Sequence, residues 1–599
     1  MSEKSIIIIG AGMSGLSAGC YGQMNGYRTQ IFEMHSKAGG VCTSWKRKGY
    51  TIQTAGWLTG SRPENNDFHA YWRELGAVQG QTFVDYEEYV RIEGSEGQVL
   101  TLYTDIDRLA EHLHDLAPED EETIDEFIET LRGFTSFEMD QDKPPELYSF
   151  FERAKMMLSM IPAMLGPQGK WMKMTLADMA NEFKNPFLRE ALGKSLLHTI
   201  FFDDRQGAMM LLNFLAWFHL KTASYPVGGL QMVVDAIEQR YHDLGGEIHF
   251  KSRVAKILVE ADPSGRGDRA VGVRLQDGTE HRADVVISAA DGRATIFDML
   301  GARYIDDKIQ DHYDNPELLP PMFFVSVGVD RTFEQRPPSA GGEVFLFDEP
   351  VTIAGKEQDR MAVHIYDFDP TVAPEGKTLL RLWLPADFDY WKDLRAQDRE
   401  RYKAEKQQVA DQMIAQLDRR YPGLADQVEM CDVATPATFE RYTGNWQSSY
   451  MGWLFTPEAA MTQIDKTLPG LDNFFMIGQW VGATSIPMAA TSGRHVTQII
   501  CDEDDKPFVT TLPQPKEAQE QVKAEEKTST GQRWEKADQW VEIDLDLCTG
   551  AGNCVDVCPA DVYKVVDGKV TADSIDECIE CGACEDECPS KAILRHWAW

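Results

Sequence analysis

Ile6-Ile7-Ile8-Ile9-Gly10-Ala11-Gly12-Met13-Ser14-Gly15 stands near the start of the 599-residue chain and decides how that part of it folds. A short aliphatic run ends in three glycines spaced G-x-G-x-x-G, and a helical pattern then runs from Leu16 to about Asn25. A second strand is expected at Arg28–Phe32, with the acidic Glu33 directly after it. Strand, glycine loop, helix, strand and acidic residue in this order are typical of a βαβ unit that binds a dinucleotide.

The main residues of this Rossmann-type unit each have a physical role. Gly10 permits a tight turn, Gly12 lets the backbone approach the pyrophosphate, and Gly15 lets the helix pack closely on the strand. The amino end of the helix supplies N–H donors and a positive dipole to the phosphates. Glu33 is expected to accept hydrogen bonds from the adenosine ribose. The unit by itself fits NAD as well as FAD.

Motifs further along the chain point to a flavin. A glycine pair opens the stretch Gly39–Tyr50. Phe474–Trp480 predicts a strand and a glycine turn before a helix that begins near Pro487, and the amino end of this helix would stabilise an anionic reduced flavin. Together with the strands expected at Gly246–Phe250 and Ala283–Ala290, these residues resemble the FAD-dependent amine oxidase superfamily. The resemblance is closest to its phytoene desaturase, carotenoid isomerase and retinol saturase branch.

The resemblance covers nearly all of residues 5–502 and implies FAD as the cofactor. Three places depart from the superfamily's pattern: Val41 replaces a common arginine, Gln479 replaces a common acidic residue, and Gly482–Ser485 differ from its glycine-rich loop. The identity of the substrate therefore does not follow from the resemblance. The residues expected to bind FAD are Gly10, Gly12, Met13, Ser14, Gly15, Glu33, Met34, Gly39, Gly40, Val41, Val254, Ala289, Gly478, Gln479, Ile486, Pro487 and Met488.

Seven of the 11 cysteines lie between Cys548 and Cys588. The second half of this cluster, Cys578–Pro589, has the spacing C-x2-C-x2-C-x3-C-P of bacterial ferredoxins. The first half, Cys548–Pro559, repeats the frame with Ala551 at the second cysteine position. A duplicated ferredoxin spacing in a large enzyme indicates iron–sulfur clusters, and a zinc site is the weaker alternative.

In two-cluster ferredoxins the fourth cysteine of each run ligates the other cluster. Carried over position by position, this rule implies a complete [4Fe–4S] site made of Cys558, Cys578, Cys581 and Cys584. The other site keeps three thiolates, those of Cys548, Cys554 and Cys588. Because the alanine at the remaining position cannot bind iron, we expect a [3Fe–4S] cluster there, or a [4Fe–4S] cluster with one ligand that is not cysteine. The first is preferred, since Gly550-Ala551-Gly552 resembles the loop of three-iron ferredoxins.

The sequence thus predicts an α/β Rossmann-type FAD-binding domain with an inserted substrate domain, followed by a C-terminal α+β two-cluster ferredoxin fold. The expected boundaries are 1–502 for the oxidoreductase, 503–538 for a polar linker and 539–599 for the ferredoxin domain. FAD-binding parts are expected at about 1–100, 222–300 and 446–502, and substrate-domain insertions at about 101–221 and 301–445. In the ferredoxin domain, strands are expected at Trp540–Asp544 and Ala592–His596, with a hairpin across Val562–Val570.

Two apolar stretches fall in the first insertion. Phe150–Met174 is rich in methionine and aromatic residues, and residues 201–218 hold a second such set. Residues of these types line adaptable apolar pockets or let a helix dip into a membrane interface, and ordinary helical core is the third interpretation. A lipophilic substrate tunnel is preferred, partly because the resembled branch binds isoprenoids. His198 and His219 are expected to be packed rather than catalytic, and no catalytic residue is assigned.

The charge balance excludes one class of partner. With 59 Lys and Arg against 96 Asp and Glu, the net charge of −37 repels nucleic acid. The sequence holds no run of about 18 apolar residues, and its first apolar run is too short for a secretory signal. The chain is therefore expected in the cytoplasm, and peripheral contact with the inner face of the membrane is left open.

Flavins exchange two electrons as a hydride, whereas iron–sulfur clusters carry one electron at a time. A chain with both is expected to act on C–C and C=C bonds of a hydrophobic, polyene or isoprenoid-like substrate, with a one-electron carrier protein as a further partner. Reduction is preferred, because low-potential clusters are natural donors to a flavin. The alternatives are a reduced-flavin isomerase, an amine oxidase, and a flavin–ferredoxin electron-transfer relay without a small substrate of its own.

Overall fold

The computed structural model describes residues 4–596 apart from 55, 63–66, 137–141, 166–167, 200–202, 262–266, 334–335, 458–463, 483–484, 514–530, 537–538, 559, 561, 579–583, 585–587 and 591. The chain divides into two units, Met1–Ser44 with Gln53–Pro513, and Trp45–Ile52 with Gln514–Trp599. Among the described residues, no helix combines the length and the apolar character that a membrane span needs.

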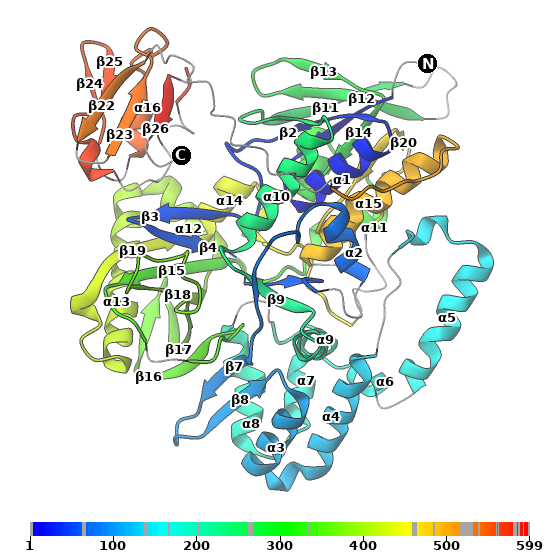
Figure 1. Ribbon diagram of the computed structural model, residues 1–599, viewed down its shortest axis with the longest axis vertical. Helices are drawn as coiled ribbons and strands as arrows, with labels where there is room; N and C mark the ends of the chain where they lie inside the picture. The colour runs from blue at the N-terminus through cyan, green and yellow to red at the C-terminus, as the bar shows by residue number, and fades with distance from the viewer. Residues whose placement is uncertain are drawn as a thin grey trace. The chain divides into compact units, whose positions relative to one another are not determined.

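A five-stranded parallel sheet of order β10-β2-β1-β14-β21 lies in the first unit (Figure 1). Its strands are β1 (Ser5–Ile9), β2 (Arg28–Phe32), β10 (Glu247–His249), β14 (Val285–Ser288) and β21 (Phe474–Met476). In β1, Ile6 and Ile8 pack with the helices α1 (Met13–Met24), α10 (Leu230–Asp243) and α15 (Ile486–Glu503). Ile7 and Ile9 pack with β11 (Val254–Ala261) and β12 (Asp268–Leu275). An unbroken aliphatic run suits this strand because side chains alternate between two covered faces.

The elements predicted around the glycine loop are confirmed. β2 has the predicted bounds, and α15 begins one residue before Pro487. α1 begins at Met13 rather than at Leu16, so the last residues of the glycine loop already belong to the helix. β10 and β14 lie within the two stretches where further strands were expected.

A seven-stranded sheet of order β19-β15-β18-β17-β16-β7-β8 forms the second layer of the first unit. Its strands are β7 (Glu88–Glu93), β8 (Val99–Tyr103), β15 (Met322–Val329), β16 (Glu343–Ile353), β17 (Lys356–Ile365), β18 (Thr378–Pro385) and β19 (Val428–Ala434). Helices α12 (Phe388–Gln397) and α13 (Arg399–Arg420) pack on one face, where Phe323, Val325 and Leu382 are buried. Although β7 precedes the predicted boundary at about residue 100, it joins this sheet because Arg91 and Ile92 pair with β16.

The first insertion is mainly helical and contains α3 (Ile106–Leu116), α4 (Glu121–Phe134), α5 (Phe150–Leu165), α6 (Gln168–Trp171), α7 (Leu176–Asn181), α8 (Pro186–Glu190) and α9 (Met209–His219). In α9, Leu212, Phe214 and Phe218 are buried. In α5, by contrast, Phe150 and Phe151 are each 81% exposed. The interpretation of residues 150–174 as ordinary helical core is therefore wrong for the start of α5.

Shorter elements complete the first unit and its borders: β3 (Ser44–Arg47), β4 (Tyr50–Gln53), β5 (Leu58–Thr59), α2 (Asp67–Glu74), β6 (Phe83–Val84), β9 (Ala223–Pro226), β13 (Glu280–Arg282), α11 (Asp307–Asp314), α14 (Pro436–Thr443) and β20 (Leu471–Asp472). The strand β9 pairs with both β5 and β6. It precedes α10.

The second unit contains an antiparallel sheet of β22 (Gln532–Lys536), β23 (Gln539–Ile543) and β26 (Ile593–His596). A hairpin of β24 (Lys564–Val566) and β25 (Lys569–Thr571) turns at Asp567 and Gly568, whose φ angles of 49° and 75° are positive. The short helix α16 (Asn553–Val557) lies in the first cysteine run. The strands and the hairpin predicted for the ferredoxin domain are confirmed.

The range 503–538, predicted as a linker, has ordered structure at both ends. The Val509 N–H donates to Asn25 Oδ1 at 2.8 Å, and Arg240 Nη2 donates to the Thr511 carbonyl at 2.8 Å. These bonds hold the chain against the ends of α1 and α10 as far as residue 511. At the other end, β22 pairs with β23. Residues 514–530 lie outside the described residues, so a linker there stays a prediction.

Candidate functional site

The carboxyl ends of four parallel strands bring the predicted flavin motifs together. The Gly10 N–H donates to the carbonyl of Phe32 at 2.8 Å, which joins the ends of β1 and β2. The Ala289 N–H donates to the carbonyl of Ile9 at 2.9 Å, at the end of β14. The Ile477 N–H in turn donates to the Ser288 carbonyl at 2.9 Å, which places Gly478 at the same edge. Ligands of open α/β sheets bind at this edge.

The glycine loop leaves room and donors for a phosphate. A Cβ atom at Gly12 would meet nothing within 4 Å, so the backbone there is open to a ligand. A Cβ atom at Gly15 would lie 1.9 Å from the Gly10 carbonyl oxygen, so this position requires glycine. No side chain caps α1, which begins with Met13 and Ser14. The uncapped N–H groups of this first turn fit a pyrophosphate.

Glu33 is held beside this loop. Its side chain is 7% exposed, its Oε2 accepts the Ala11 N–H at 2.6 Å, and its Oε1 accepts the His35 N–H at 2.8 Å. Burial raises the pKa of this carboxyl, whereas the backbone N–H bonds lower it. A carboxylate kept at the end of β2 in this way has free lone pairs for ribose hydroxyls.

The second glycine pair lies against the first loop. The Gly39 N–H donates to the Ala11 carbonyl at 3.0 Å, and a Cβ atom at Gly40 would lie 3.5 Å from the Cα of Gly12. The carbonyl of Val41 accepts a hydrogen bond from the hydroxyl of Thr54. Residues 39–41 are thus placed beside the pyrophosphate position.

Two further predicted residues lie close to Glu33. Arg253 Nη1 donates to the sulfur of Met34 at 3.8 Å. Val254 begins β11 and is buried in the core below the sheet. The Ser252 N–H donates to the Glu33 carbonyl at 2.8 Å, so the segment 252–254 borders the predicted ribose position.

The C-terminal flavin motif closes the same site. The Gly478 N–H donates to Ser492 Oγ at 2.9 Å, and a Cβ atom at Gly478 would lie 3.0 Å from Ser14 Oγ. Gln479 Nε2 donates to the Ser449 carbonyl at 3.2 Å.

The helix α15 begins at Ile486 with Pro487 in its first turn, and Ser485 Oγ caps it by accepting the Met488 N–H at 3.4 Å. The second turn of α15 contacts both motifs, because Ser492 Oγ accepts the Gly478 N–H and the Ala490 carbonyl accepts the hydroxyl of Ser17 in α1. The structure brings the predicted glycine motifs and Glu33 to the carboxyl edge of this one sheet, and the donors and open backbone there fit FAD.

Asp291 is a residue that the sequence prediction did not assign. It follows β14 directly, is 5% exposed, and accepts the Ala294 and Trp446 N–H groups at 2.8 Å each. Burial raises the pKa of this carboxyl to about 6. The sequence signal that could have identified it is an aspartate directly after the strand expected at Ala283–Ala290.

The second apolar stretch packs on aromatic residues of the first unit. The ring of Trp57 lies 5.4 Å from that of Phe214 and 5.2 Å from that of Phe218. Phe201 and Phe202, which the sequence analysis placed in the same stretch, lie outside the described residues.

Both histidines of this region are engaged by backbone groups. His219 Nδ1 accepts the Ile106 N–H at 3.2 Å. The Nδ1 atom of His198 lies 3.2 Å from the Lys194 carbonyl, and burial lowers the pKa of this imidazole to about 4. This packing supports the expectation that neither histidine is catalytic.

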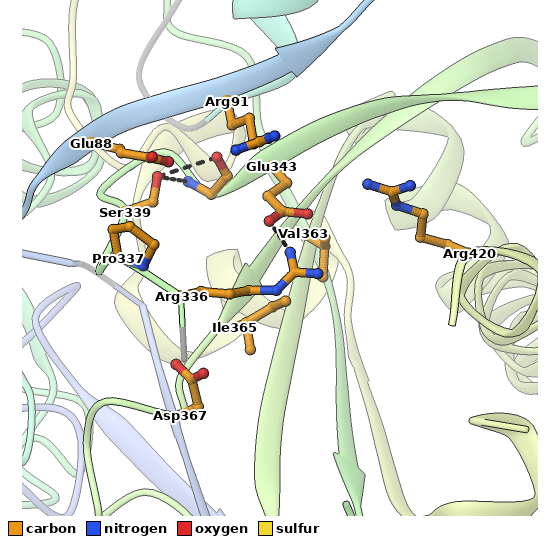
Figure 2. Close-up of a pocket in the computed structure, with 11 residues that line it drawn as sticks. Glu88, Arg91, Arg336, Pro337, Ser339, Glu343, Val363, Ile365, Asp367 and Arg420 are labelled. Carbon is orange, nitrogen blue, oxygen red and sulfur yellow. Dashed lines mark hydrogen bonds and ion pairs between the residues drawn. The ribbon is translucent and has the colours of Figure 1, made fainter. Parts of the chain in front are cut away.

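A charged pocket lies beside β7, the start of β16 and the end of β17. It has a volume of about 300 Å³, and Figure 2 shows Arg336 paired with Glu343 beside Arg91 and Asp367. Glu88, which also lines it, is 6% exposed, and burial raises the pKa of its carboxyl. A lining with this many charges does not suit an apolar substrate.

Three cysteines of the second unit form one group. Burial, together with the neighbouring Cys588 and Cys548, raises the pKa of the Cys554 thiol to about 11. Ala551 is exposed in the loop before α16. A Cβ atom at Gly550 would lie 2.2 Å from the Gly568 carbonyl oxygen, so glycine is required beside this alanine. The group matches the predicted three-thiolate set.

Three other cysteines surround Tyr563. Burial raises the pKa of this phenol, and so do the thiols of Cys584, Cys578 and Cys558. The Tyr563 hydroxyl donates to Cys584 Sγ at 3.1 Å. The fourth predicted ligand of this set, Cys581, lies outside the described residues.

Backbone donors support both groups in the same way. The Val562 N–H donates to Cys558 Sγ at 3.4 Å, and the Ala592 N–H donates to Cys588 Sγ at 3.3 Å. Within the described residues, no three His, Cys, Asp or Glu side chains are gathered closely enough for a single metal ion. Two sets of thiols with N–H···S bonds fit iron–sulfur clusters, which are wider than one ion and are tuned by such bonds.

Two family models match the chain. The model described as flavin containing amine oxidoreductase matches residues 13–501, and the model described as 4Fe-4S dicluster domain matches residues 540–589. Among curated relatives, the prolycopene isomerase of Daucus carota is 23% identical over 467 residues, which cover 75% of this chain and 72% of the relative. The neurosporene-forming phytoene desaturase of Rhodobacter capsulatus is 24% identical over 527 residues, which cover 83% and 94%.

Solved structures support the fold. Putrescine oxidase bound to putrescine has a TM-score of 0.51 at 14% identity, and the match covers 84% of this chain and 99% of the oxidase. An oxidoreductase from Methanosarcina mazei has a TM-score of 0.50 at 16% identity, with coverage of 82% and 100%.

These matches confirm the predicted branch and the predicted fold class, an FAD-binding α/β fold followed by a ferredoxin domain. They also confirm the flavin and a [4Fe–4S] cluster as cofactors. The chain therefore belongs to the flavin-containing amine oxidoreductase family and is an oxidoreductase that combines FAD with a 4Fe-4S dicluster domain.

Proposed function

We propose that this oxidoreductase acts on C–C and C=C bonds of a hydrophobic, polyene or isoprenoid-like substrate and exchanges electrons with its ferredoxin domain. By their names, the curated relatives act on prolycopene and phytoene. These names support the class of substrate. The position of its binding site is argued from the residues of this chain.

The observation that carries the proposal is a cluster of aromatic side chains in the first unit. The aromatic cluster consists of Trp57, Tyr86, Tyr89, Phe214, Phe218, Tyr225, Tyr366 and Phe368, and all but Phe368 are buried. Its rings touch one another, with centroids 5.1 Å apart for Tyr225 and Phe368 and 5.7 Å apart for Tyr86 and Phe218. Continuous aromatic surface of this kind suits a long conjugated apolar molecule.

The aromatic cluster borders the cofactor motifs. Gln53 Nε2 donates to the Tyr225 hydroxyl at 2.5 Å. The next residue, Thr54, donates its hydroxyl to the Val41 carbonyl, which belongs to the second glycine pair. Two adjacent residues, Gln53 and Thr54, therefore contact the aromatic cluster and the flavin-binding loop.

The chain's own residues would bind and orient the cofactor and would shield the reacting bonds from water. The glycine loop and the amino end of α1 hold the phosphates, and Glu33 orients the ribose. The aromatic cluster keeps water away from the reacting bonds. When bound, FAD supplies two-electron hydride exchange, and the clusters supply single electrons.

Reduction of the substrate is the preferred direction. Electrons from a one-electron carrier protein would then enter through the ferredoxin domain, whose cysteines would hold the clusters. Desaturation would send the electrons outward, and an isomerase would need them only to keep the flavin reduced. The choice rests on the low potentials that are common for ferredoxin clusters.

For the clusters, we assign the [4Fe–4S] site to Cys558, Cys578, Cys581 and Cys584, and a [3Fe–4S] site to Cys548, Cys554 and Cys588. The separate grouping of the described thiols around Cys554 and Tyr563 supports this division. A [4Fe–4S] cluster with one ligand that is not cysteine is the alternative at the second site.

The start of α5 suits peripheral contact with an anionic membrane. Phe150, Phe151, Met157 and Leu158 are between 65% and 81% exposed. From residue 150 to residue 173 the chain has four basic residues and one acidic residue, against 59 and 96 in the whole chain. Exposed aromatic residues with local positive charge favour an anionic lipid surface and would bring an apolar substrate within reach. The cytoplasmic location stays a prediction.

Anaerobic flavin absorbance tests the function. Cellular lipid extract is added to the oxidised protein and, separately, to the dithionite-reduced protein. Reoxidation of the reduced flavin identifies a reductase of C=C bonds, and bleaching of the oxidised flavin identifies a desaturase or dehydrogenase. No response in either state contradicts net redox chemistry on those lipids and favours the isomerase or the electron-transfer relay.

A further inference from the structure

The seven-stranded sheet has one face that is free of α12 and α13. Residues with odd numbers in β15 and even numbers in β18, such as Phe323, Val325 and Leu382, pack under the two helices. The even-numbered residues of β15 and the odd-numbered residues of β18 must therefore point to the opposite face. In the centre of that face, Ser326 on β15 and His364 on β17 both pair with Arg381 on β18. These three side chains form a row across three strands, named the polar row here.

The polar row is buried, and each of its three side chains has a polar atom without a hydrogen-bond partner among the described residues. Ser326, Arg381 and His364 are 1%, 2% and 5% exposed. Ser326 Oγ, Arg381 Nε and His364 Nε2 have no hydrogen-bond partner among the described residues. Burying a polar atom without a partner costs free energy, and three such atoms in one row point to a ligand that would pair with them.

The guanidinium of Arg381 has no carboxylate partner in the described part of the chain. Its Nη1 donates to the Gln53 carbonyl at 2.6 Å, and its carbon lies 5.0 Å and 5.3 Å from the ring centres of Phe324 and Tyr366. The buried carboxylate of this region, Asp369, instead accepts hydrogen bonds from Tyr225 and from the N–H groups of Gly228 and Thr371.

A second buried arginine on the same face of the sheet has its positive charge paired with carboxylates. Arg360 on β17 is also 2% exposed, and it pairs with Glu190 at 2.8 Å and with Asp359 at 2.9 Å. Buried charges are normally paired in this way. Arg381 therefore differs from Arg360 in carrying a positive charge that forms no ion pair with a described carboxylate.

The polar row lies between the aromatic cluster and the cofactor motifs. The ring of His364 stacks on that of Tyr366, a member of the aromatic cluster, with centroids 6.4 Å apart. On the other side, Trp383 follows Arg381 on the same face and lies 5.5 Å from the ring of Tyr450. The residue before Tyr450, Ser449, accepts the hydrogen bond of Gln479 in the C-terminal flavin motif.

We propose that the polar row binds the anionic end of the substrate, so that this enzyme acts on an apolar molecule with a carboxylate rather than on a pure hydrocarbon. Arg381 supplies the positive charge, and Ser326 and His364 supply neutral hydrogen-bonding groups beside it. Burial and the nearby Arg381 hold the pKa of His364 well below its usual range, so this imidazole stays neutral and leaves the arginine as the single charge. The inference rests on the proposed apolar substrate site and names the chemistry of its end.

Paired probes test the inference on the full-length holoprotein. trans-Parinaric acid, a fluorescent polyene with a carboxylate, is compared with its methyl ester at a pH where the acid is ionised. We expect the acid to bind the wild-type protein at least about tenfold more tightly than the ester. In Arg381→Gln we expect this preference to disappear while the affinity for the ester stays within about twofold of wild type.

Arg360→Gln is the matched control, because it also removes a buried arginine from the same face, and it should keep the preference for the acid. Should Arg381→Gln fail to fold, Ser326→Ala and Arg381→Lys replace it, and each should reduce the preference. Equal binding of acid and ester to the wild type overturns the inference and leaves the apolar site standing. Failure of both probes to bind overturns the apolar site as well.

Persistence of the acid preference in a folded Arg381→Gln also overturns the inference. If that variant shifts the flavin reduction potential instead, the charge of Arg381 serves the reduced flavin and not a substrate.

Discussion

Gly12 and Gly15 belong to one loop, yet substitution should impair FAD binding at Gly12 and the stability of the fold at Gly15. A Cβ atom at Gly12 meets no protein atom within 4 Å, and the φ of −73° suits any L-residue. Gly12→Ala should therefore unfold at the wild-type temperature as apoprotein and bind FAD poorly. At Gly15 the added atom would lie 1.9 Å from the Gly10 oxygen, so Gly15→Ala should lose about 2 kcal/mol of stability or more.

Flavin absorbance per chain and thermal unfolding of the apoproteins distinguish these outcomes. Normal FAD content in Gly12→Ala would show that the pyrophosphate does not approach this backbone. Unchanged unfolding of Gly15→Ala would show that the loop relaxes around the new methyl group.

Ala551 decides the composition of the second cluster in our proposal. Ala551→Cys adds one sulfur to an exposed loop residue and restores the complete ferredoxin frame. We expect the variant to gain one iron atom per chain and to lose the electron paramagnetic resonance signal of the oxidised [3Fe–4S] cluster. Anaerobic iron analysis and that spectrum provide the measurement. A variant with unchanged iron content would favour a wild-type [4Fe–4S] cluster with a different fourth ligand.

At the scale of elements, α5 is the helix whose exposure the sequence could not settle. Burying one aromatic side chain in a lipid interface contributes about 2 kcal/mol. Replacing Phe150 and Phe151 with serine should therefore weaken binding to vesicles of phosphatidylglycerol and phosphatidylcholine by on the order of 1,000-fold. Vesicle sedimentation measures the effect, and high salt should weaken the wild-type binding as well.

The matched control for α5 removes exposed apolar side chains elsewhere. Val565 and Val566 are 44% and 49% exposed, and their double replacement with serine should leave vesicle binding unchanged. An equal loss in both double variants would indicate unspecific hydrophobic adsorption. Absence of vesicle binding by the wild type would contradict the membrane proposal.

The elements nearest to motifs were the ones that the sequence predicted well. β1, β2, α1 and α15 follow from a glycine spacing and from hydrophobic runs that local backbone chemistry determines. β7 falls within the range predicted as FAD-binding, yet it pairs with β16, which begins at Glu343, far along the chain. Pairing between distant strands leaves no local mark in the sequence.

For the whole molecule, we predict that the clusters lie on the route of electrons to the flavin. Cys584→Ser removes a thiol of the [4Fe–4S] set, and the variant should retain wild-type FAD content. Reduction of its flavin by reduced methyl viologen should slow by at least about tenfold, because single electrons lose their relay. Reoxidation of photoreduced flavin by substrate should not change. Stopped-flow absorbance measures both steps.

Cys431→Ser is the control for this variant, since Cys431 lies on β19, outside the ferredoxin domain. It should behave as the wild type in both steps. Normal methyl viologen reduction in a cluster-free Cys584→Ser would show that the flavin accepts electrons directly and that the clusters serve another partner.

The sequence by itself determined the cofactors and the domain order of this protein. The flavin loop and the ferredoxin cysteines act through short segments of backbone, so their spacing is written in the chain from Gly10 to Gly15 and from Cys578 to Cys588. Such motifs are readable because the ligand contacts neighbouring residues.

Only the tertiary structure decided which polar groups are buried without partners and which apolar groups remain exposed. Ser326, His364 and Arg381 lie far apart in sequence and meet because β15, β17 and β18 are neighbours in one sheet. Phe150 and Phe218 look alike as residues, yet the first is 81% and the second 2% exposed. Burial depends on what packs against a residue from distant parts of the chain, and no local pattern records that.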